Sequence, residues 1–322
     1  MAACRVYIFT YRRNNLLPRA IQSLLDQTFT DWVCEVHNDD PGDPFPSTYI
    51  GELADPRFYL KNHISNQGGV ASFNLAFQDG KEPYAAMLED DNWWAPEFLE
   101  IMIRELEKET IAEIAVSNEF IWQETIAGTW EQTGTTIWPL CEGRDYYYRT
   151  PADQCGSAKI CNSSMLWKTN HSQNWLTPND IPIDVTEHFR ERLLPLPVLL
   201  IHTPLVNFSR TIQTSRSSGI LWGGYQVLLI ASIFNGLDQE KRNELAAFLW
   251  TKGKLNRPYR TTLLHTALAD RKSRVLLRRA RLPELLRYLL TWLRHPSGCY
   301  QTIKAKKKYK THWLYLLKTN PS

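Results

Sequence analysis

Short apolar runs alternate with longer, helix-like stretches over roughly the first 120 residues. The short runs are rich in β-branched and aromatic residues, which favours buried strands, whereas the longer stretches repeat apolar residues at helical spacing. Asn14 or Asn15 is expected to cap the first helix, with Pro18 in its first turn. The expected strands are residues 5–10, 32–37, 58–61, 84–88 and 114–117, and the expected helices are residues 16–25, 70–78 and 97–109.

This alternation predicts the fold class α/β, with a Rossmann-like, doubly wound and mostly parallel sheet. Ligands of such sheets bind beyond the carboxyl ends of the strands. Three polar clusters follow three of the expected strands, at residues 10–13, 38–40 and 89–92. The sequence therefore predicts that these clusters meet at one edge of the sheet.

The rest of the chain follows a different pattern. Residues 118–180 combine Trp, Tyr, Thr and Gly and predict irregular structure with short strands, and residues 184–194 predict a helix. Beyond about residue 215 the pattern is helical and increasingly basic, so we expect a domain at 1–215 and a helical, basic C-terminal region at 216–322. The uncharged stretch 217–237 contains polar and glycine residues, including Gly219, Gly223, Gly224, Gln226 and Asn235, which favours a buried or interfacial helix over a membrane span.

Charge is distributed unevenly. Residues 1–250 carry 19 Lys and Arg against 32 Asp and Glu, a net −13, whereas residues 251–322 carry 18 against 2, a net +16. A basic region with amphipathic segments and terminal aromatic residues is typical of attachment to an anionic membrane surface. A helical cap with a solvated basic face, or a site for a protein partner, would show the same pattern. No nucleic acid is expected as a partner, because no recognised binding motif accompanies the charge.

The cysteines and the N-terminus bear on the expected location. Six cysteines show no CxxC spacing, so buried free thiols in a reducing compartment are expected rather than a zinc site. The first residues lack the layout of a signal peptide. The expected location is therefore cytoplasmic, with peripheral attachment to the inner face of the membrane as an option.

Three successive carboxylates, Glu89, Asp90 and Asp91, directly follow the fourth expected strand. Carboxylates this close repel one another unless a cation or hydrogen-bond donors compensate them. Mg²⁺ and Mn²⁺ prefer such oxygen ligands and complete their coordination with water and substrate phosphates. A solvated acidic turn is the structural alternative, and the position at a strand end beside Trp93 and Trp94 favours a site.

Four motifs resemble those of family 2 glycosyltransferases with the GT-A fold. The segment 88–99 resembles the DxD region of that family, residues 6–13 resemble its first strand and nucleotide-binding turn, residues 36–40 resemble its second-strand carboxylates, and residues 66–71 resemble its Asn-x-Gly segment. The four motifs occur in the family's order and cover about residues 4–100, with weaker similarity to about residue 215.

The resemblance implies roles for individual residues. In the nucleotide-binding turn, Tyr11 would stack on the nucleobase, Thr10 would shape the turn and Arg13 would belong to the same binding set. Asp39 would accept a hydrogen bond from a uracil-type imide. The remaining implied contacts are Asn66 and Gly68 with the diphosphate-sugar, Asp90 with ribose or sugar hydroxyls, and Asp91 with Glu89 as ligands of Mn²⁺ or Mg²⁺.

An inverting transfer also needs a general base, which removes the proton from the attacking hydroxyl. The resemblance indicates Asp184, with Asp180 and Glu187 as competitors, and helix capping is the structural alternative for Asp184. Arg210, in the segment 209–218 that resembles a mobile donor-covering segment, could bind the diphosphate or belong to a solvated basic loop. Candidates for an acceptor platform are Trp93, Trp94, Trp122, Trp130, Trp138, Trp167 and Trp175.

The resemblance implies an inverting, metal-dependent glycosyltransferase of the hexosyltransferase type. Its donor would be a nucleotide diphosphate sugar, a UDP-sugar by the uracil argument, and its acceptor a glycan or lipid-linked hydroxyl in surface polysaccharide or oligosaccharide biosynthesis. A nucleotidyltransferase acting on sugar phosphates could use the same carboxylates, although no Gly-rich, Lys-bearing phosphate loop lies near the N-terminus. A non-catalytic, membrane-associated binding subunit is the third hypothesis.

Overall fold

The computed structural model describes residues 2–78, 80–140, 145–155, 158–212, 218–251 and 257–318. The chain forms two compact units. The first unit comprises residues 1–149, 159–183 and 195–215, and the second comprises residues 150–158, 184–194 and 216–322. Two short segments expected in the N-terminal domain thus belong to the second, helical unit.

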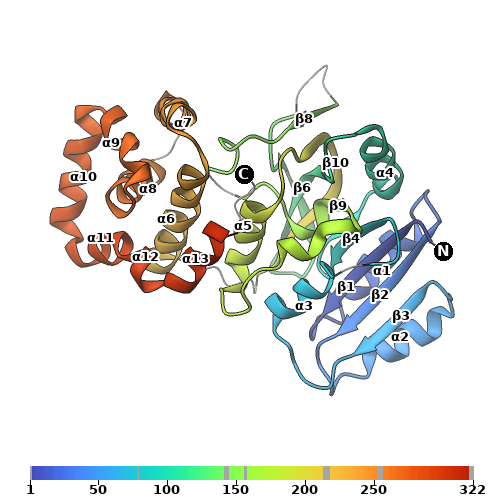
Figure 1. Ribbon diagram of the computed structural model, residues 1–322. Coiled ribbons are helices and arrows are strands. Elements are labelled where there is room, and N and C mark those ends of the chain that lie inside the picture. The colour runs from blue at the N-terminus through green and yellow to red at the C-terminus, as the bar shows by residue number, and fades with distance from the viewer. Residues whose placement is uncertain are drawn as a thin grey trace. The chain divides into compact units, whose positions relative to one another are not determined.

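Four parallel strands form one half of the sheet in the first unit, in the order β3-β2-β1-β4 (Figure 1). They are β1 (Cys4–Thr10), β2 (Trp32–Asn38), β3 (Phe58–Asn62) and β4 (Tyr84–Glu89). Crossovers through helices allow this parallel arrangement. The predicted fold class, a mostly parallel α/β sheet, is confirmed.

Part of the other half of the sheet comes from residues 118–180, which were expected to be irregular with short strands. Strand β9 (Met165–Lys168) runs antiparallel between β4 and β6 (Ile114–Glu124), and β10 (Leu199–Arg210) runs parallel to β6. Strand β6 continues seven residues beyond the expected strand 114–117. The shorter strands β5 (Trp93–Trp94), β7 (Trp130–Thr136) and β8 (Tyr146–Tyr148) pair with β10, β6 and β10, respectively.

Helices cover both faces of the parallel half. On one face, α1 (Leu17–Leu25) and α4 (Phe98–Lys108) bury their apolar residues against the side chains of β1, β2 and β4, and α2 (Phe45–Leu53) packs at the periphery. On the other face, α3 (Gly69–Leu75) brings Phe73 edge-on to Phe9 of β1. The prediction of an asparagine cap for α1 is wrong, because the N-cap is Leu16 and the buried Asn14 Oδ1 has no hydrogen-bond partner among the described residues.

The second unit is helical. Helix α5 (Ile183–Leu193) contributes all but its first residue, and α6 (Gly219–Gly236) lies at the centre, in contact with α8, α11, α12 and α13. Helix α6 has the length and composition of a membrane span, but 56% of it is buried within the structure, as expected of a core helix. The remaining helices are α7 (Gln239–Thr251), α8 (Arg257–Ala269), α9 (Val275–Arg279), α10 (Leu282–Arg294), α11 (Pro296–Ile303), α12 (Ala305–Lys308) and α13 (Lys310–Lys318).

Candidate active site

The polar clusters follow strands that are paired to their last residues. Thr10, at the end of β1, is in register with Asn38 of β2, and Phe9 is in register with Glu89 of β4. The backbone N–H of Asp39 donates to the Thr10 carbonyl at 3.0 Å. All three clusters therefore lie at the carboxyl edge of the sheet, with the β1 cluster between the other two.

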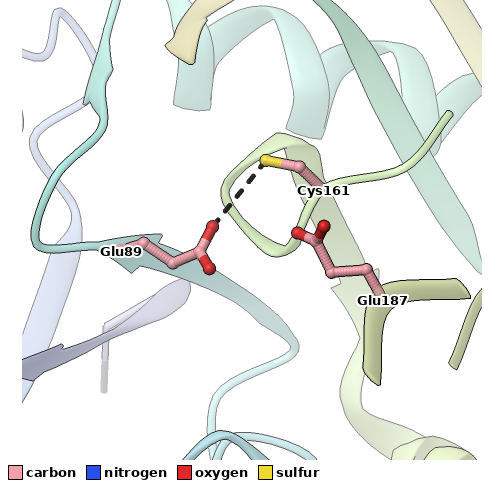
Figure 2. A group of neighbouring side chains, drawn as sticks. All are labelled: Glu89, Cys161 and Glu187. Atoms are coloured by element: carbon pink, nitrogen blue, oxygen red, sulfur yellow. Dashed lines mark hydrogen bonds between the residues drawn. The ribbon is translucent and has the colours of Figure 1, made fainter. Parts of the chain in front are cut away.

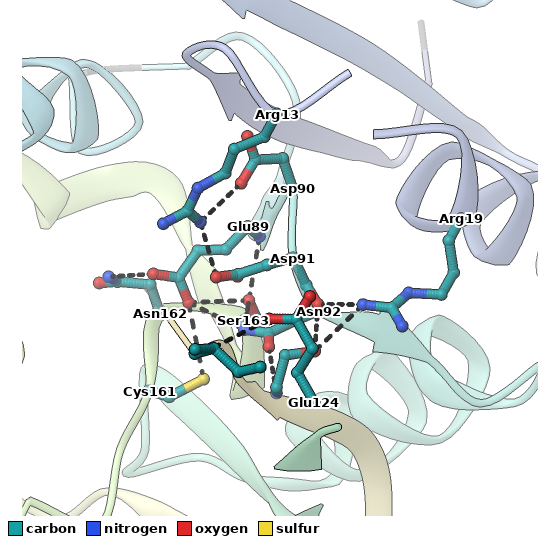
Figure 3. A network of polar contacts seen from close by, with 12 residues as sticks. Arg13, Arg19, Glu89, Asp90, Asp91, Asn92, Glu124, Cys161, Asn162 and Ser163 are labelled. Atoms are coloured by element: carbon teal, nitrogen blue, oxygen red, sulfur yellow. Dashed lines mark hydrogen bonds and ion pairs between the residues drawn. The ribbon is translucent and has the colours of Figure 1, made fainter. Parts of the chain in front are cut away.

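The turn between β1 and α1 contacts both neighbouring clusters. Arg13 Nη1 lies 2.6 Å from Asp91 Oδ2 and 3.1 Å from Asp90 Oδ1 (Figure 3). Arg12 Nε lies 2.6 Å from Asp40 Oδ2, and its φ of 56° turns the chain so that the two arginines reach opposite sides. One turn thus joins the carboxylates that follow β2 to those that follow β4.

The carboxylates after β4 lack sufficient positive charge around them. Burial, followed by repulsion from Asp91, raises the pKa of Asp90 to about 7, although Arg13 and Thr10 act in the opposite direction. Burial and repulsion from Asp91 raise the pKa of Glu89, and burial raises that of Asp91. Three buried carboxyl groups beside the single guanidinium of Arg13 fit a divalent cation, which would supply further positive charge.

Glu89 differs from its neighbours because hydrogen-bond donors surround it. Its Oε2 accepts from Ser163 Oγ at 3.0 Å and Asn92 Nδ2 at 3.1 Å, and Cys161 Sγ lies 3.8 Å away (Figure 2). Within the described part of the chain, its Oε1 has only a long hydrogen bond of 3.4 Å from Asn162 Nδ2. Glu89 therefore anchors the segment before β9 through one oxygen and leaves the other the freer ligand atom.

Arg19 of α1 holds the turn that carries Asp91. Its guanidinium lies 3.9 Å from the ring centroid of Trp93 and 4.4 Å from that of Trp130. One Nη donates to the Asp91 carbonyl at 2.6 Å (Figure 3) and to Ser209 Oγ at 3.1 Å. Burial lowers the pKa of Arg19 to about 10, which leaves the side chain charged at neutral pH.

On the β2 side, Asp39 fixes the loop that precedes α3. Its Oδ1 accepts from the Gln67 N–H at 2.8 Å, and its Oδ2 accepts from the Gly68 N–H at 3.2 Å. Asn66 Oδ1 also accepts from the Gly68 N–H, at 2.8 Å. Gly68 has φ 79° and ψ 144°, a conformation that only glycine adopts without strain. Asp39, Asn66 and Gly68 are therefore brought together, as their common assignment to donor binding requires.

A row of polar side chains along β2 leads to Asp39. Glu35 Oε1 lies 3.0 Å from His37 Nε2, His37 Nδ1 lies 2.9 Å from His63 Nε2, and His63 Nδ1 lies 2.8 Å from Asp39 Oδ1. At the other end of this row, Arg5 of β1 bonds Glu35 at 3.0 Å and Glu82 at 2.7 Å.

The model of the glycosyl transferase family 2 matches residues 5–168, which is just over half of the chain. The chain belongs to glycosyl transferase family 2. Among curated proteins, it is 28% identical over 120 residues to Escherichia coli K12 WcaA, whose name assigns it to colanic acid biosynthesis as a glycosyl transferase. It is 26% identical over 119 residues to the E. coli UDP-Glc:α-D-GlcNAc-diphosphoundecaprenol β-1,3-glucosyltransferase WfgD. These matches cover 37% of this chain and span 43% and 47% of the two relatives.

Solved structures extend the likeness in fold to nearly the whole chain. S. aureus TarS residues 1–349 in complex with UDP match with a TM-score of 0.63 over 96% of this chain and 91% of that one, at 12% identity. The same fragment in complex with UDP-GlcNAc matches with a TM-score of 0.60. At this identity the likeness establishes the GT-A fold and not the specificity.

Tyr11 and Arg210 are two further residues of this family 2 chain that were assigned to donor binding. Tyr11 is 42% exposed, with Arg12 stacked on its ring, so it can take a base on its solvent side. Arg210 ends β10 directly after Ser209, whose backbone N–H and hydroxyl donate to Asn92 and to the Asp91 carbonyl, respectively. Because successive strand side chains alternate, Arg210 projects from the face of β10 opposite to Ser209. Residues 213–217 of the expected donor-covering segment lie outside the described residues, as does Cys141.

The tryptophans divide into two groups. Trp94, Trp138, Trp167 and Trp175 are buried, and they are packing residues rather than a platform. Trp93, Trp122 and Trp130 are partly exposed and in mutual contact, with ring centroids 5.1 Å and 6.2 Å from that of Trp93. These three are the remaining candidates for binding an acceptor.

Asp184 lies in the first turn of α5, as its second residue, and belongs to the second unit. It follows Ile183 within the helix and so does not occupy the N-cap position. Glu187 lies one turn further along α5, whereas Asp180 is an exposed residue of the first unit.

Several residues of this site show no recognisable pattern in the sequence. Arg19 gave no signal, because an arginine on an amphipathic helix is normally a surface residue. The segment 161–163, which surrounds Glu89, matched no motif. Glu119 of β6 is buried, and burial, with a weaker contribution from Glu89, raises its pKa to about 8. Glu119 stood in a segment expected to be irregular, where burial could not be predicted.

Proposed function

We propose that this chain is an inverting glycosyltransferase that transfers a sugar from a UDP-sugar to an acceptor hydroxyl. The observation that carries the proposal is the joining of Asp39, Asp90 and Asp91 around one turn, at the edge where such sheets bind ligands. Membership of glycosyl transferase family 2 makes sugar transfer the reaction that this cluster would serve.

The donor would lie along the carboxyl edge. Tyr11 offers a ring face for the base, and Asp39 retains acceptor capacity beyond its present bonds, since a carboxylate has about four lone-pair sites. The loop 66–68 presents backbone close to the diphosphate, and Thr10, Arg13 and Asp90 complete the proposed contacts. UDP and UDP-GlcNAc bind TarS, and WfgD is named as a UDP-Glc enzyme, which supports a uridine donor.

Asp91 and the freer oxygen of Glu89 would hold Mn²⁺ or Mg²⁺. Such an ion supplies neutralisation of the diphosphate leaving group. Arg13 occupies part of this position in the structure and contributes the same sign of charge. Arg210 would add a further cationic contact to the diphosphate through movement of the segment that follows β10.

The acceptor hydroxyl needs a proton acceptor, which we assign to Asp184. Trp93, Trp122 and Trp130 would provide an apolar surface for an acceptor sugar ring. A glycan or lipid-linked acceptor in surface polysaccharide biosynthesis fits the names of both curated relatives.

Calorimetry with UDP, GDP, ADP and UTP, each with and without Mn²⁺, tests the proposal. We expect UDP to bind best and to gain affinity with Mn²⁺. Asp91→Ala should remove the Mn²⁺ effect and lower transfer about a hundredfold or more, because the leaving group loses several kcal/mol of stabilisation. Asp55→Ala, which removes a carboxylate paired with Arg57 at 2.6 Å outside the cluster, is the matched control.

Three outcomes would contradict the proposal. Full activity of Asp91→Ala in chelator would remove the cation from the model. Preference for UTP with release of pyrophosphate would indicate a nucleotidyltransferase. Absence of binding to every nucleotide would indicate a non-catalytic binding subunit.

A further inference from the structure

Helix α10 shows five leucines to solvent. Leu282, Leu286, Leu289, Leu290 and Leu293 are each more than half exposed, from 51% to 76%. At 3.6 residues per turn their positions fall within an arc of about 100°, so they form one continuous stripe, which we call the leucine face. Single exposed leucines are ordinary on protein surfaces, but a contiguous row usually marks an interaction site.

The opposite side of α10 is firmly packed. Glu284 is 9% exposed and pairs with Arg260 of α8 at 2.8 Å, and Tyr288 is 7% exposed with its ring 5.2 Å from that of His265. Leu285 and Trp292 pack against the same core. The leucine face is therefore not the consequence of a loose helix, because α10 is held by its other side.

A cationic groove borders the leucine face. It lies between α8 and α10, has a volume of about 280 Å³, and includes Arg260, Arg287, Arg294 and Leu290 in its lining. Arg287 and Arg294 are exposed and form no ion pair among the described residues. Arg260 turns one nitrogen to Glu284, while its buried Nε has no hydrogen-bond partner among those residues. The groove offers fork-shaped donors of the kind that bind phosphate oxygens.

Basic residues far outnumber acidic ones in the part of the chain that contains α10. Residues 251–322 contain 18 basic residues and two acidic ones, Asp270 and Glu284. Asp270 pairs with Lys306 at 2.7 Å and Glu284 pairs with Arg260, so both carboxylates are already engaged. The terminal aromatic residue Trp313, expected at an interface, is only 8% exposed, which leaves the leucine face as the prominent apolar row of this region.

We propose that α10 docks on an anionic phospholipid bilayer, with the leucine face among the acyl chains and the groove on lipid phosphates. An apolar stripe flanked by arginines is complementary to a surface with acyl chains below anionic headgroups. A second copy of this chain fits less well, because a symmetric contact would bring the arginines of both copies together. Nucleic acid would leave the leucines in water. The proposal does not depend on sugar transfer.

Flotation of the full-length protein with unilamellar vesicles is the test. Vesicles of phosphatidylcholine with phosphatidylglycerol should bind the protein, and phosphatidylcholine alone should bind it at least about tenfold more weakly. Leu286→Gln with Leu290→Gln should reduce binding about tenfold or more. The matched pair Leu268→Gln with Leu314→Gln, at leucines 43% and 45% exposed on α8 and α13, should leave binding unchanged.

A second pair tests the groove. Arg287→Gln with Arg294→Gln should lower affinity for the anionic vesicles about tenfold and flatten its dependence on salt. Arg278→Gln with Arg279→Gln, exposed on α9 and outside the groove, should have a smaller effect. Unchanged melting temperature and UDP affinity in each variant show that folding and donor binding are intact, so failure here is separate from failure of the proposed function.

Several results would overturn the proposal. Equal binding to both kinds of vesicle would show that the groove does not bind lipid phosphates. An equal loss of vesicle binding in the two leucine double variants would show that α10 is not the docking element. A dimer in light scattering that only the α10 leucine pair dissociates, with vesicle binding unchanged, would assign the leucine face to a second copy.

Discussion

The arginine that holds the turn of Asp91 shows how a residue outside the sequence motifs can control the site. Arg19 combines cation–π contacts to Trp93 and Trp130 with a hydrogen bond to the Asp91 carbonyl. Lysine has the same charge but neither the planar group nor the forked donors. The geometry of the turn therefore depends on the guanidinium itself.

We expect Arg19→Lys to lower UDP affinity in the presence of Mn²⁺ about tenfold, which corresponds to about 1.4 kcal/mol. The Asp91 carbonyl and Ser209 would lose a shared donor, and the turn would become less ordered. Titration calorimetry measures the change. Arg104→Lys, on the exposed side of α4, should change nothing, and an Arg19→Lys variant with normal affinity would show that the turn holds without the guanidinium.

The carboxylates of the site could be predicted from the sequence, but the residues that surround them could not. Asp39, Asp90 and Asp91 follow strands directly, and strand ends can be read from apolar runs. Apart from the nearby Asn92, the partners of Glu89 come from residues 161–163, more than seventy positions away, and no local pattern records such a contact. On the β1 and β2 side, hydrogen bonds link Thr10, Asp39, Asn66 and Gly68, as their assignment to one binding site suggested. Arg210, in contrast, projects from the face of β10 opposite to Ser209.

Among the elements, the loop that leads into α3 depends on one backbone conformation. Gly68 donates to Asp39 and Asn66 with φ at 79°. An alanine could keep these bonds only in a strained conformation, at a cost of about 1–3 kcal/mol.

Gly68→Ala should therefore lower the free energy of unfolding by about 1–3 kcal/mol or, if the loop relaxes instead, weaken UDP binding by a comparable amount. Urea unfolding and calorimetry together measure both alternatives. Gly51→Ala, within helix α2 and with open space around the new methyl group, should be neutral or stabilising by about 0.5–1 kcal/mol. An unchanged stability and affinity in Gly68→Ala would refute the assigned role of the loop.

Helix α8 contains a buried histidine, His265, which makes the folded protein less stable at low pH. Burial lowers the pKa of His265 to about 4, and its Nε2 has no hydrogen-bond partner among the described residues. The unfolded chain binds this proton near pH 6.5, so stability decreases as the pH falls from about 6.5 to about 4 and then levels off. The whole effect is at most about 3 kcal/mol.

His265→Phe should make the melting temperature less dependent on pH between 7 and 5, because the aromatic replacement carries no titrating group. His295→Gln, at an exposed histidine before α11, is the control and should keep the wild-type dependence. A His265→Phe variant as sensitive to acid as the wild type would place the titrating group elsewhere.

The elements themselves were predicted unevenly. The parallel half of the sheet was predicted within one or two residues, because alternation of apolar runs with amphipathic helices is a strong local signal. The extended β6 and its partner β7 were not, because the Trp, Thr and Gly residues in them resemble loop composition. Their order depends on pairing between distant strands, which periodicity does not encode.

For the whole molecule, the proposed reaction separates into donor binding and proton removal. The proposed donor residues belong to the first unit, whereas Asp184 is assigned to the second. Asp184→Asn should leave UDP affinity within about twofold of the wild type and lower transfer about 100- to 10,000-fold, the range of general-base catalysis. Asp180→Asn is the matched control, at an exposed carboxylate nearby in sequence. Normal transfer by Asp184→Asn, or loss in Asp180→Asn, would move the base to another residue.

The polar row along β2 has a consequence for how this sheet can evolve. Polar side chains in successive contact run from Glu82 through Arg5, Glu35, His37 and His63 to Asp39. Loss of one member would leave its neighbour in the row without a partner, at a cost in stability that a second substitution at that neighbour could relieve. These positions should accordingly change together among descendants of this sequence, as one inherited set that reaches from the residues before β4 to the loop before α3.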